Sequence, residues 1–314
     1  PVLGFDSPVT YLQSNPAGVA QAITVDPVLP TSSTYGDSFT VTATGGDSGI
    51  SLVFTSAGGC SNIDNVYTMT SGVTACQVIV NQAGDETYNA ATQYSGSVTA
   101  SKIALEITAD AQSKNFGDAD PELTYSTTSG SLINPDALSG SLSRAAGTAV
   151  GTYAITIGSL SAGSNYDITY VPATLTINKA RIAVTGTKVY DGEIEILGSE
   201  LAAQGVLGQT FTVSGSASMR TKNVQTNATL ANVSGLTLSE SGNGLLSNYE
   251  NIAVSDTSVT ITKKNVTLTA PTIVKTYDGG YTYTMTSDDL SNMSSQLVAG
   301  DRVVGASVTF ASKD

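Results

Sequence analysis

The chain has 314 residues, contains neither His nor Trp, and carries a formal net charge of −13 with only 12% charged residues. Without His, Ser-His-Asp and Cys-His catalytic arrangements and His-ligated metal sites are excluded, and with so few Lys and Arg we expect no nucleic-acid partner, because its phosphates need many cations. No apolar run approaches the roughly 20 residues that a membrane helix requires, so we expect no membrane span.

Short segments of alternating apolar and polar residues fill the first part of the chain. Residues 1–21 match no pattern and are expected to be a linker or a strand of a preceding unit. Residues 22–102 contain SFTVTAT (38–44), LVFTS (52–56) and GSVTASK (96–102). Segments rich in Val and Thr, separated by Gly, Ser and Asp, are typical of half-buried β-strands. We therefore predict a first β-domain over residues 22–102.

The only two cysteines, Cys60 and Cys76, lie in this first unit. Their spacing fits no zinc or thioredoxin-type motif. In CQVIV, Cys76, Val78 and Val80 share one strand face, so the sulfur is expected to point inward. The pair is either two buried free thiols or a disulfide, which would stabilise the domain by roughly 3 kcal/mol and indicate an oxidising compartment. We predict the disulfide.

Three motifs recur in the same order along the chain. The aromatic–Gly motif (STYGD, KNFGD, KVYDG, KTYDG) carries Tyr35, Phe116, Tyr190 and Tyr277. The Asn–Tyr motif is NYDI at 165–168 and NYEN at 248–251, with TYNA at 87–90 in its place in the first unit. An alternating strand that ends in Lys closes each unit, at 96–102, 173–179 and 258–264. Motifs repeated in a fixed order indicate a repeated structural unit, so we predict further domains at 103–179 and 180–264 and a fourth unit from residue 265.

Short strands at regular spacing, without helical periods, predict an all-β chain: an elongated, tandem array of Ig-like β-sandwich domains. Helix is expected only as short turns at 200–205 (ELAAQG) and 288–297 (DDLSNMSSQL). Residues 265–314 are interpreted as an incomplete domain, because half a sandwich leaves strand edges open. The remainder is expected to lie beyond the fragment, to be disordered, or to be supplied by another chain through β-strand addition.

Few residues are candidates for chemistry. No Walker A or Rossmann glycine pattern opens a helix, so we expect no enzyme and no cofactor. The alternating carboxylates of FGDADPEL, namely Asp118, Asp120 and Glu122, are calcium candidates because calcium prefers oxygen ligands. The alternative, which we favour, is a solvated turn interrupted by Pro121.

Lysine and asparagine vary together between the units. In the second and third units, Lys114 and Lys188 stand two residues before the aromatic residue, and Asn165 and Asn248 precede the later Tyr. In the first unit, Ser33 replaces the Lys and Thr87 replaces the Asn. Residues i and i+2 of a strand share a face, so Lys188 is expected on the face of Tyr190, where a buried ammonium needs a partner. A Lys–Asn isopeptide bond within each unit is one interpretation. The other is a strand-end Lys that reaches solvent and an Asn that serves as a turn residue.

The motifs resemble known repeat families. Residues 103–179, with ITADAQSKNFGDADPELTY, resemble MBG ("mostly bacterial Ig-like") repeats, and residues 180–264 and 265–314, with KVYDG and KTYDG, resemble YDG repeats. Residues 22–102 resemble bacterial Ig-like repeats in which a Cys pair is common. Such repeats are similar to those of large secreted bacterial surface proteins and adhesins. The resemblance implies an extracellular position at the bacterial cell surface and supplies no catalytic residues.

We therefore expect a non-catalytic stalk in a cell-surface adhesin. Its partners would be neighbouring domains or copies of the same protein, and host or matrix glycans or proteins through parts outside this segment. One alternative is a subunit of an extracellular fibre, filament or sheath whose last domain is completed by a neighbouring chain. Another is a glycan- or protein-binding module.

Overall fold

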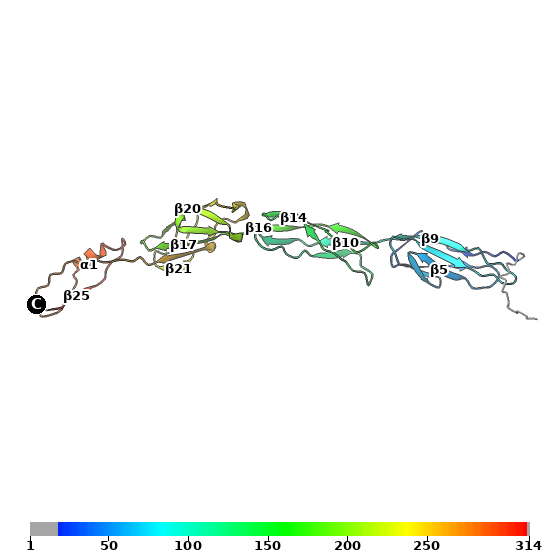
Figure 1. Ribbon diagram of the computed structural model, residues 1–314, viewed down its shortest axis with the longest axis horizontal. Helices are drawn as coiled ribbons and strands as arrows, with labels where there is room; N and C mark the ends of the chain where they lie inside the picture. The colour runs from blue at the N-terminus through cyan, green and yellow to red at the C-terminus, as the bar shows by residue number, and fades with distance from the viewer. Residues whose placement is uncertain (1–17, 313–314) are drawn as a thin grey trace, which may run out of the picture. The chain divides into compact units, whose positions relative to one another are not determined.

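The structure, a computed structural model, describes residues 18–312 of the chain. Strands dominate the described residues (Figure 1), which confirms the predicted all-β class. Contacts divide the described residues into two compact units. One holds those up to 112 together with 122–146 and 153–175, and the other holds 113–121, 147–152 and those from 176 to 312. Below, modules 1 to 4 denote the predicted stretches 22–102, 103–179, 180–264 and 265–314.

Module 1 is built from two sheets that enclose one core. Its strands are β1 (Thr24–Val25), β2 (Ser32–Thr34), β3 (Ser38–Thr40), β4 (Ala43–Thr44), β5 (Val53–Gly58), β6 (Cys60–Ile63), β7 (Val66–Met69), β8 (Cys76–Asn81) and β9 (Tyr94–Ser101). The sheets run β2-β9-β8-β5 and β3-β7-β6, and β1 pairs with β4. Tyr67 and Met69 of β7 share the core with Val78 of β8 and Val98 of β9. The alternation along β8 buries Cys76, Val78 and Val80, as the sequence predicts.

Module 2 contains a three-stranded sheet in the order β12-β10-β15. Its strands are β10 (Ile103–Ala109), β11 (Gln112–Asn115), β12 (Tyr125–Ser129), β13 (Ser143–Arg144), β14 (Gly151–Thr156), β15 (Tyr166–Val171) and β16 (Ala173–Asn178). Strand β13 pairs with β14 in antiparallel register. Ile107 of β10, Ile155 of β14 and Leu175 of β16 are fully buried in one core.

Module 3 forms a seven-stranded sheet in which β22 pairs with β20 beside the path β18-β20-β19-β17-β23-β21. The strands are β17 (Ala183–Val189), β18 (Glu195–Leu197), β19 (Leu201–Gln204), β20 (Thr210–Ser218), β21 (Gln225–Ala228), β22 (Leu236–Glu240) and β23 (Thr257–Thr262). Four 3₁₀ turns connect them: η1 (Gly198–Glu200), η2 (Val206–Gly208), η3 (Leu246–Asn248) and η4 (Val254–Asp256).

The helical turn predicted at 200–205 is wrong, because most of that segment is strand β19. Its burial alternates, with Leu201 and Ala203 inside, as a strand requires and a helix does not. Strand β19 pairs with β17 and with β20. Tertiary pairing thus overrides the helix propensity of the Leu-Ala-Ala run.

Module 4 holds the α-helix α1 (Ser287–Ser294), which confirms the helical prediction at 288–297, and the antiparallel pair β24 (Thr282–Thr284) and β25 (Ser307–Thr309). A capping box begins the helix: Asp289 N donates to Thr286 Oγ1 at 3.3 Å and Thr286 N donates to Asp289 Oδ2 at 2.9 Å. No helix within residues 18–312 has the length and apolar character needed to cross a membrane.

Each of the first three modules begins beside one of its own late strands. Strand β2 pairs in parallel with β9, β10 with β15 and β17 with β23. Just before or at these entries, Val19, Ile103 and Ala180 pair in parallel with Tyr88, Tyr166 and Tyr249. The second residue of the Asn–Tyr motif therefore receives the incoming chain at the start of each module, whether Asn165 and Asn248 or Thr87 precedes it.

Candidate functional site

The KVYDG segment folds into a closed turn at the end of β17. Lys188 Nζ lies 3.0 Å from Asp191 Oδ1 and donates hydrogen bonds to the carbonyl oxygens of Glu193 and Glu195. The same carboxylate oxygen of Asp191 accepts the amide of Glu193 at 3.0 Å. Gly192 between them has φ +85°, a conformation that residues with a Cβ rarely adopt. The motif is therefore a self-contained turn whose buried ammonium is satisfied locally.

The KTYDG segment of module 4 builds the same turn. Lys275 Nζ pairs with Asp278, and Asp278 Oδ1 accepts the amide of Gly280 at 2.8 Å. Lys275 Nζ also donates to the carbonyl of Gly280 at 3.2 Å, and Gly279 has φ +81°.

In module 2 the related KNFGD segment uses the same residue types at a different spacing. Lys114 Nζ donates to the carbonyl of Asp118 at 2.7 Å and pairs with Asp120 Oδ1 at 2.8 Å. The lysine again closes a turn beside the aromatic residue.

The strand that ends in Lys fixes the position of each aromatic residue. The amide of Tyr35 donates to Ser101 O, that of Phe116 to Asn178 O and that of Tyr190 to Thr262 O, all at 2.9 Å. The acceptors are the last or nearly the last residues before the next module begins. The aromatic–Gly motif is thus held at the exit of its own module.

A tight turn in the following module meets this exit. We call three segments docking turns: Ile133–Asp136, Val206–Gln209 and Val298–Asp301. In each, the amide of the fourth residue donates to the carbonyl of the first, at 2.7, 3.1 and 3.0 Å respectively. Each turn places an apolar side chain first and a side-chain oxygen acceptor fourth.

The apolar residue of each docking turn lies against the glycine of the aromatic–Gly motif. A Cβ on Gly117 would lie 2.5 Å from Val206 Cγ2, and one on Gly192 would lie 2.7 Å from Val298 Cγ1. A Cβ on Gly36 would collide with Ile133 Cδ1 in the same way. The missing side chain therefore makes room for the docking turn.

The fourth residue of the docking turn accepts a tyrosine hydroxyl. Tyr35 and Tyr190 of the preceding modules donate to Asp136 Oδ2 at 2.9 Å and to Asp301 Oδ1 at 2.7 Å. Phe116 has no hydroxyl, and the turn that meets it carries Gln209 in place of Asp. Gln209 Oε1 instead accepts the hydroxyl of Tyr249, in its own module, at 2.7 Å.

The Asn–Tyr motif completes the junctions on either side of module 2. The rings of Tyr35 and Tyr166 meet edge to face with centroids 5.8 Å apart, and those of Phe116 and Tyr249 do so at 5.6 Å. Asn165 Oδ1 accepts the amide of Gly72 at 2.9 Å. Asn248 Oδ1 likewise accepts the amide of Val150 at 3.0 Å. The same ring pair and the same side-chain-to-backbone bond thus occur twice.

Carboxylates at the docking turns raise the pKa values of the tyrosine hydroxyls that they accept. The hydrogen bond to Asp136 raises the pKa of Tyr35 above its usual 10.0, with burial adding to the effect. The hydrogen bond to Asp301 raises the pKa of Tyr190 in the same direction. Burial is the main cause of the raised pKa of Tyr166, whose hydroxyl also donates to Asp136 at 2.7 Å. All three phenols therefore stay protonated well into alkaline solution.

The structure does not bring Lys188 and Asn248 together for an isopeptide bond. Asn248 O accepts the amide of Ala180 at the start of module 3, whereas Lys188 lies at the far end of β17. From residue 180 to residue 188 an extended chain covers roughly 26 Å. Asn165 holds the same starting position in module 2, where its carbonyl accepts the amide of Ile103, while Lys114 is engaged by Asp118 and Asp120.

The calcium candidates do not form a site. Asp120 pairs with Lys114, and Asp118 Oδ2 accepts the amide of Asn115 at 3.1 Å. Within residues 18–312 no group of three or more His, Cys, Asp or Glu side chains is placed to hold a metal ion, so Asp118, Asp120 and Glu122 are not gathered around one point. The solvated turn that we favour stays a prediction.

Cys60 and Cys76 form the predicted disulfide. Cys60 begins β6 and Cys76 begins β8, so the bond joins the two sheets of module 1. Both residues belong to the core of that module.

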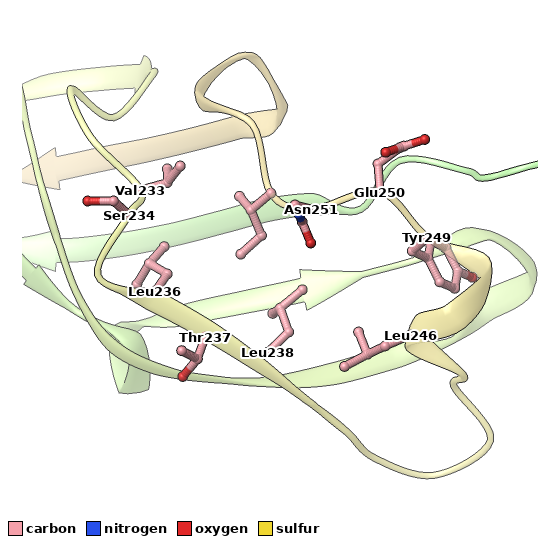
Figure 2. Close-up of a pocket in the computed structure, with 10 residues that line it drawn as sticks. Val233, Ser234, Leu236, Thr237, Leu238, Leu246, Tyr249, Glu250 and Asn251 are labelled. Atoms are coloured by element: carbon pink, nitrogen blue, oxygen red, sulfur yellow. The ribbon is translucent and has the colours of Figure 1, made fainter.

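A groove of about 490 Å³ lies beside β22 in module 3. Figure 2 shows Leu236, Leu238 and Leu246 around one hollow, with Asn251 on its other side. Glu250 is the single carboxylate among its lining residues, so the groove lacks a pair of acids for general acid–base chemistry. Its single aromatic ring, Tyr249, is only 2% exposed and offers no face for a sugar to stack on.

The docking turns are the functional residues that sequence reasoning missed. INPD, VLGQ and VAGD share an apolar first residue and an acceptor in the fourth position, which is too little to define a motif. An ungapped alignment of 297–314 with 206–223 places VAGD one position out of register with VLGQ. It does not reveal that either turn contacts the preceding module.

Comparison with known families identifies the middle of the chain. Residues 105–176 match the MBG domain (YGX type), and residues 171–258 match the YDG domain. No curated protein matches the chain. The chain therefore contains an MBG domain of the YGX type followed directly by a YDG domain, the two repeat families that its motifs resemble.

Proposed function

We propose that this chain is a non-catalytic structural stalk, a repeat region of a secreted bacterial cell-surface adhesin. The observation that carries the proposal is the recurrence of one joint: an aromatic residue and a glycine at the exit of one module, met by a docking turn of the next. Three docking turns are used in this way. A repeated joint serves a part whose task is to connect modules.

The joint combines apolar contact with directional hydrogen bonds. On either side of module 2, the joint combines a pair of aromatic rings, with centroids 5.6 or 5.8 Å apart, and a hydrogen bond accepted by a buried or half-buried Asn side chain. Together these contacts limit rotation about the linker more than either would alone. Linkers that enter the next module as paired strand residues leave little free chain between modules. Short linkers and specific contacts restrict bending in repeat proteins.

An extracellular location is supported by the disulfide, since such bonds persist in oxidising compartments. The acidic composition, with a net charge of −13, suits a surface that must stay soluble and avoid self-association. The attachment function of the adhesin and its glycan or protein partner would then lie outside this segment.

Single-molecule FRET tests the joint in the whole chain. Dyes on exposed positions of modules 1 and 2, such as Ser61 and Ser126, should give one narrow distance distribution. Tyr35→Ala combined with Asn165→Ala should broaden it, while the matched exposed changes Ser32→Ala and Ser164→Ala should not. A distribution that is already broad in the unchanged chain would sink the proposal.

Two further measurements separate the alternatives. A stalk keeps its adhesin active when modules 2 and 3 are replaced by unrelated β-domains of equal length, whereas a glycan- or protein-binding module loses attachment. Sedimentation of the 314-residue chain at rising concentration should give a monomer, and concentration-dependent polymers would favour the fibre or sheath instead.

A further inference from the structure

Module 4 carries an aromatic–Gly motif identical in construction to that of module 3. Lys188, Asp191 and the amide of Glu193 have direct counterparts in Lys275, Asp278 and the amide of Gly280. The two central glycines share a left-handed backbone, with φ +85° and +81°. The chain therefore builds the same turn twice.

The two copies differ in what covers them. Gly192 faces Val298, and the hydroxyl of Tyr190 donates to Asp301. Apart from its chain neighbours, no heavy atom of the described residues lies within 4 Å of a Cβ placed on Gly279, and Tyr277 is 71% exposed. Val274, beside the motif, is 89% exposed. The second copy is an open surface with an apolar ring, a space above a glycine and an exposed hydroxyl.

The three occupied motifs define what fits such a surface. The first residue of each docking turn is Ile or Val, and it lies over the glycine. The type of the fourth residue depends on the aromatic residue that the turn meets. Asp136 and Asp301 accept the hydroxyls of Tyr35 and Tyr190, whereas the turn that meets Phe116 carries Gln209. A carboxylate facing Phe would lose this donor, so the match between tyrosine and aspartate has a chemical reason.

We propose that Tyr277 and Gly279 form an interaction site for the docking turn of another module of this kind, with Ile or Val first and Asp fourth. The apolar side chain sits over Gly279 and the carboxylate accepts the hydroxyl of Tyr277. The site rests on the joint proposed above as part of the stalk, but not on the adhesin role. A turn with Gln in the fourth position fits it less well, so the aromatic residue of the motif sets the choice of partner module.

A turn peptide tests the site in the 314-residue chain. The probe is a backbone-cyclised peptide that contains residues 297–302, LVAGDR, titrated at pH 7 while NMR follows the labelled tyrosine rings. We expect a saturable shift of the Tyr277 ring. A peptide with Asn in place of Asp should bind roughly fivefold more weakly, and one with Ser in place of Val should also bind more weakly.

Two variants of the chain decide the outcome. In Tyr277→Phe the peptides with Asp and Asn should bind equally, because the hydroxyl that distinguishes them is gone. The double variant Val298→Ser with Asp301→Ala opens the motif at Tyr190 and serves as the positive control. Binding at the opened Tyr190 but not at Tyr277 overturns the proposed site, and binding at neither overturns recognition by the turn itself.

The FRET experiment on modules 1 and 2 separates the two proposals. If that joint is rigid while the peptide fails at Tyr277, the stalk proposal stands and the open site is wrong. If the joint is mobile while the peptide binds at Tyr277, the open site stands and the stalk proposal is wrong.

Discussion

The hydroxyl of Tyr190 donates a 2.7 Å hydrogen bond to Asp301, 111 positions further along the chain. Tyr35 and Asp136, 101 positions apart, form the same bond at 2.9 Å. Each pair joins the exit of one module to a docking turn of the next. Four predictions concern these joints and the local turns beside them, and a fifth concerns the disulfide.

Replacing Tyr190 by Phe should loosen the docking turn at 298–301. The ring stays in place, but Asp301 loses its donor, so the amide of Asp301 that donates to Val298 O should exchange at least roughly twofold faster with solvent. Hydrogen exchange with mass spectrometry measures this. Tyr277→Phe is the matched control, because Tyr277 lies in the same motif with an exposed ring; equal effects of the two changes would contradict the joint.

Raising the pH should open the joint at Tyr35. Because its pKa is raised in the folded protein, the hydrogen bond to Asp136 contributes fully below pH 10.0 and is lost as pH rises through the higher folded-state value. An alkaline titration of the Tyr35 ring by NMR should report this step. In Tyr35→Phe the step should vanish, and a normal phenol titration near 10.0 would refute the prediction.

Acid should open the KVYDG turn. Burial raises the pKa of Asp191, but hydrogen bonds from the Glu193 amide and from Lys188 outweigh it, and the net pKa lies below 3.8. The stability from this carboxylate is therefore complete above pH 3.8 and is lost as pH falls through the lower folded-state value. Denaturant unfolding of module 3 across that range should show the loss. Asp191→Asn should remove this part of the pH dependence, and an unchanged profile would count against the turn.

Replacing Lys188 by Met should destabilise module 3 by about 2 kcal/mol. The side chain of Lys188 is only 4% exposed, and Met keeps the stem but leaves the carbonyls of Glu193 and Glu195 without their donor. Chemical unfolding measures the change. Lys263→Met, at an exposed position, should have little effect.

Removing the disulfide should affect module 1 alone. The bond closes a loop with a sequence separation of 16, and Cys60→Ser with Cys76→Ser should lower the free energy of unfolding by about 3 kcal/mol. Differential scanning calorimetry with and without reductant should show one transition shifted. A shift in the transitions of modules 2 and 3 of equal size would mean that the modules do not unfold separately.

The repeat could be predicted from the sequence because residues close together in the chain determine the local structure of each motif. Lys188, Asp191 and Gly192 close a turn within a few residues, and the inward face of β8 follows from alternation alone. Such local rules are legible in one sequence. The helix predicted at 200–205 failed for the opposite reason, since pairing with β17 and β20 decides that segment.

The isopeptide hypothesis shows a second limit of prediction from a single sequence. Lys188 and Asn248 do vary together with their counterparts, but they serve opposite ends of one module: the lysine closes the exit turn, and the asparagine accepts the amide of Val150 at the entry. Correlation along the sequence therefore reported a shared role in joining modules and not a contact.

The parallel pairing of β17 with β23 has a mechanical consequence. Tension that pulls the two ends of module 3 apart draws these strands past each other along their length. The paired segment runs from Val184 opposite Thr257 to Val189 opposite Thr262, and its hydrogen bonds are then loaded in shear and all at once. In a hairpin that is peeled from its end, the bonds would break one at a time. The same holds for β2 with β9 in module 1. In modules 1 and 3 the entry strand therefore opposes extension along the chain.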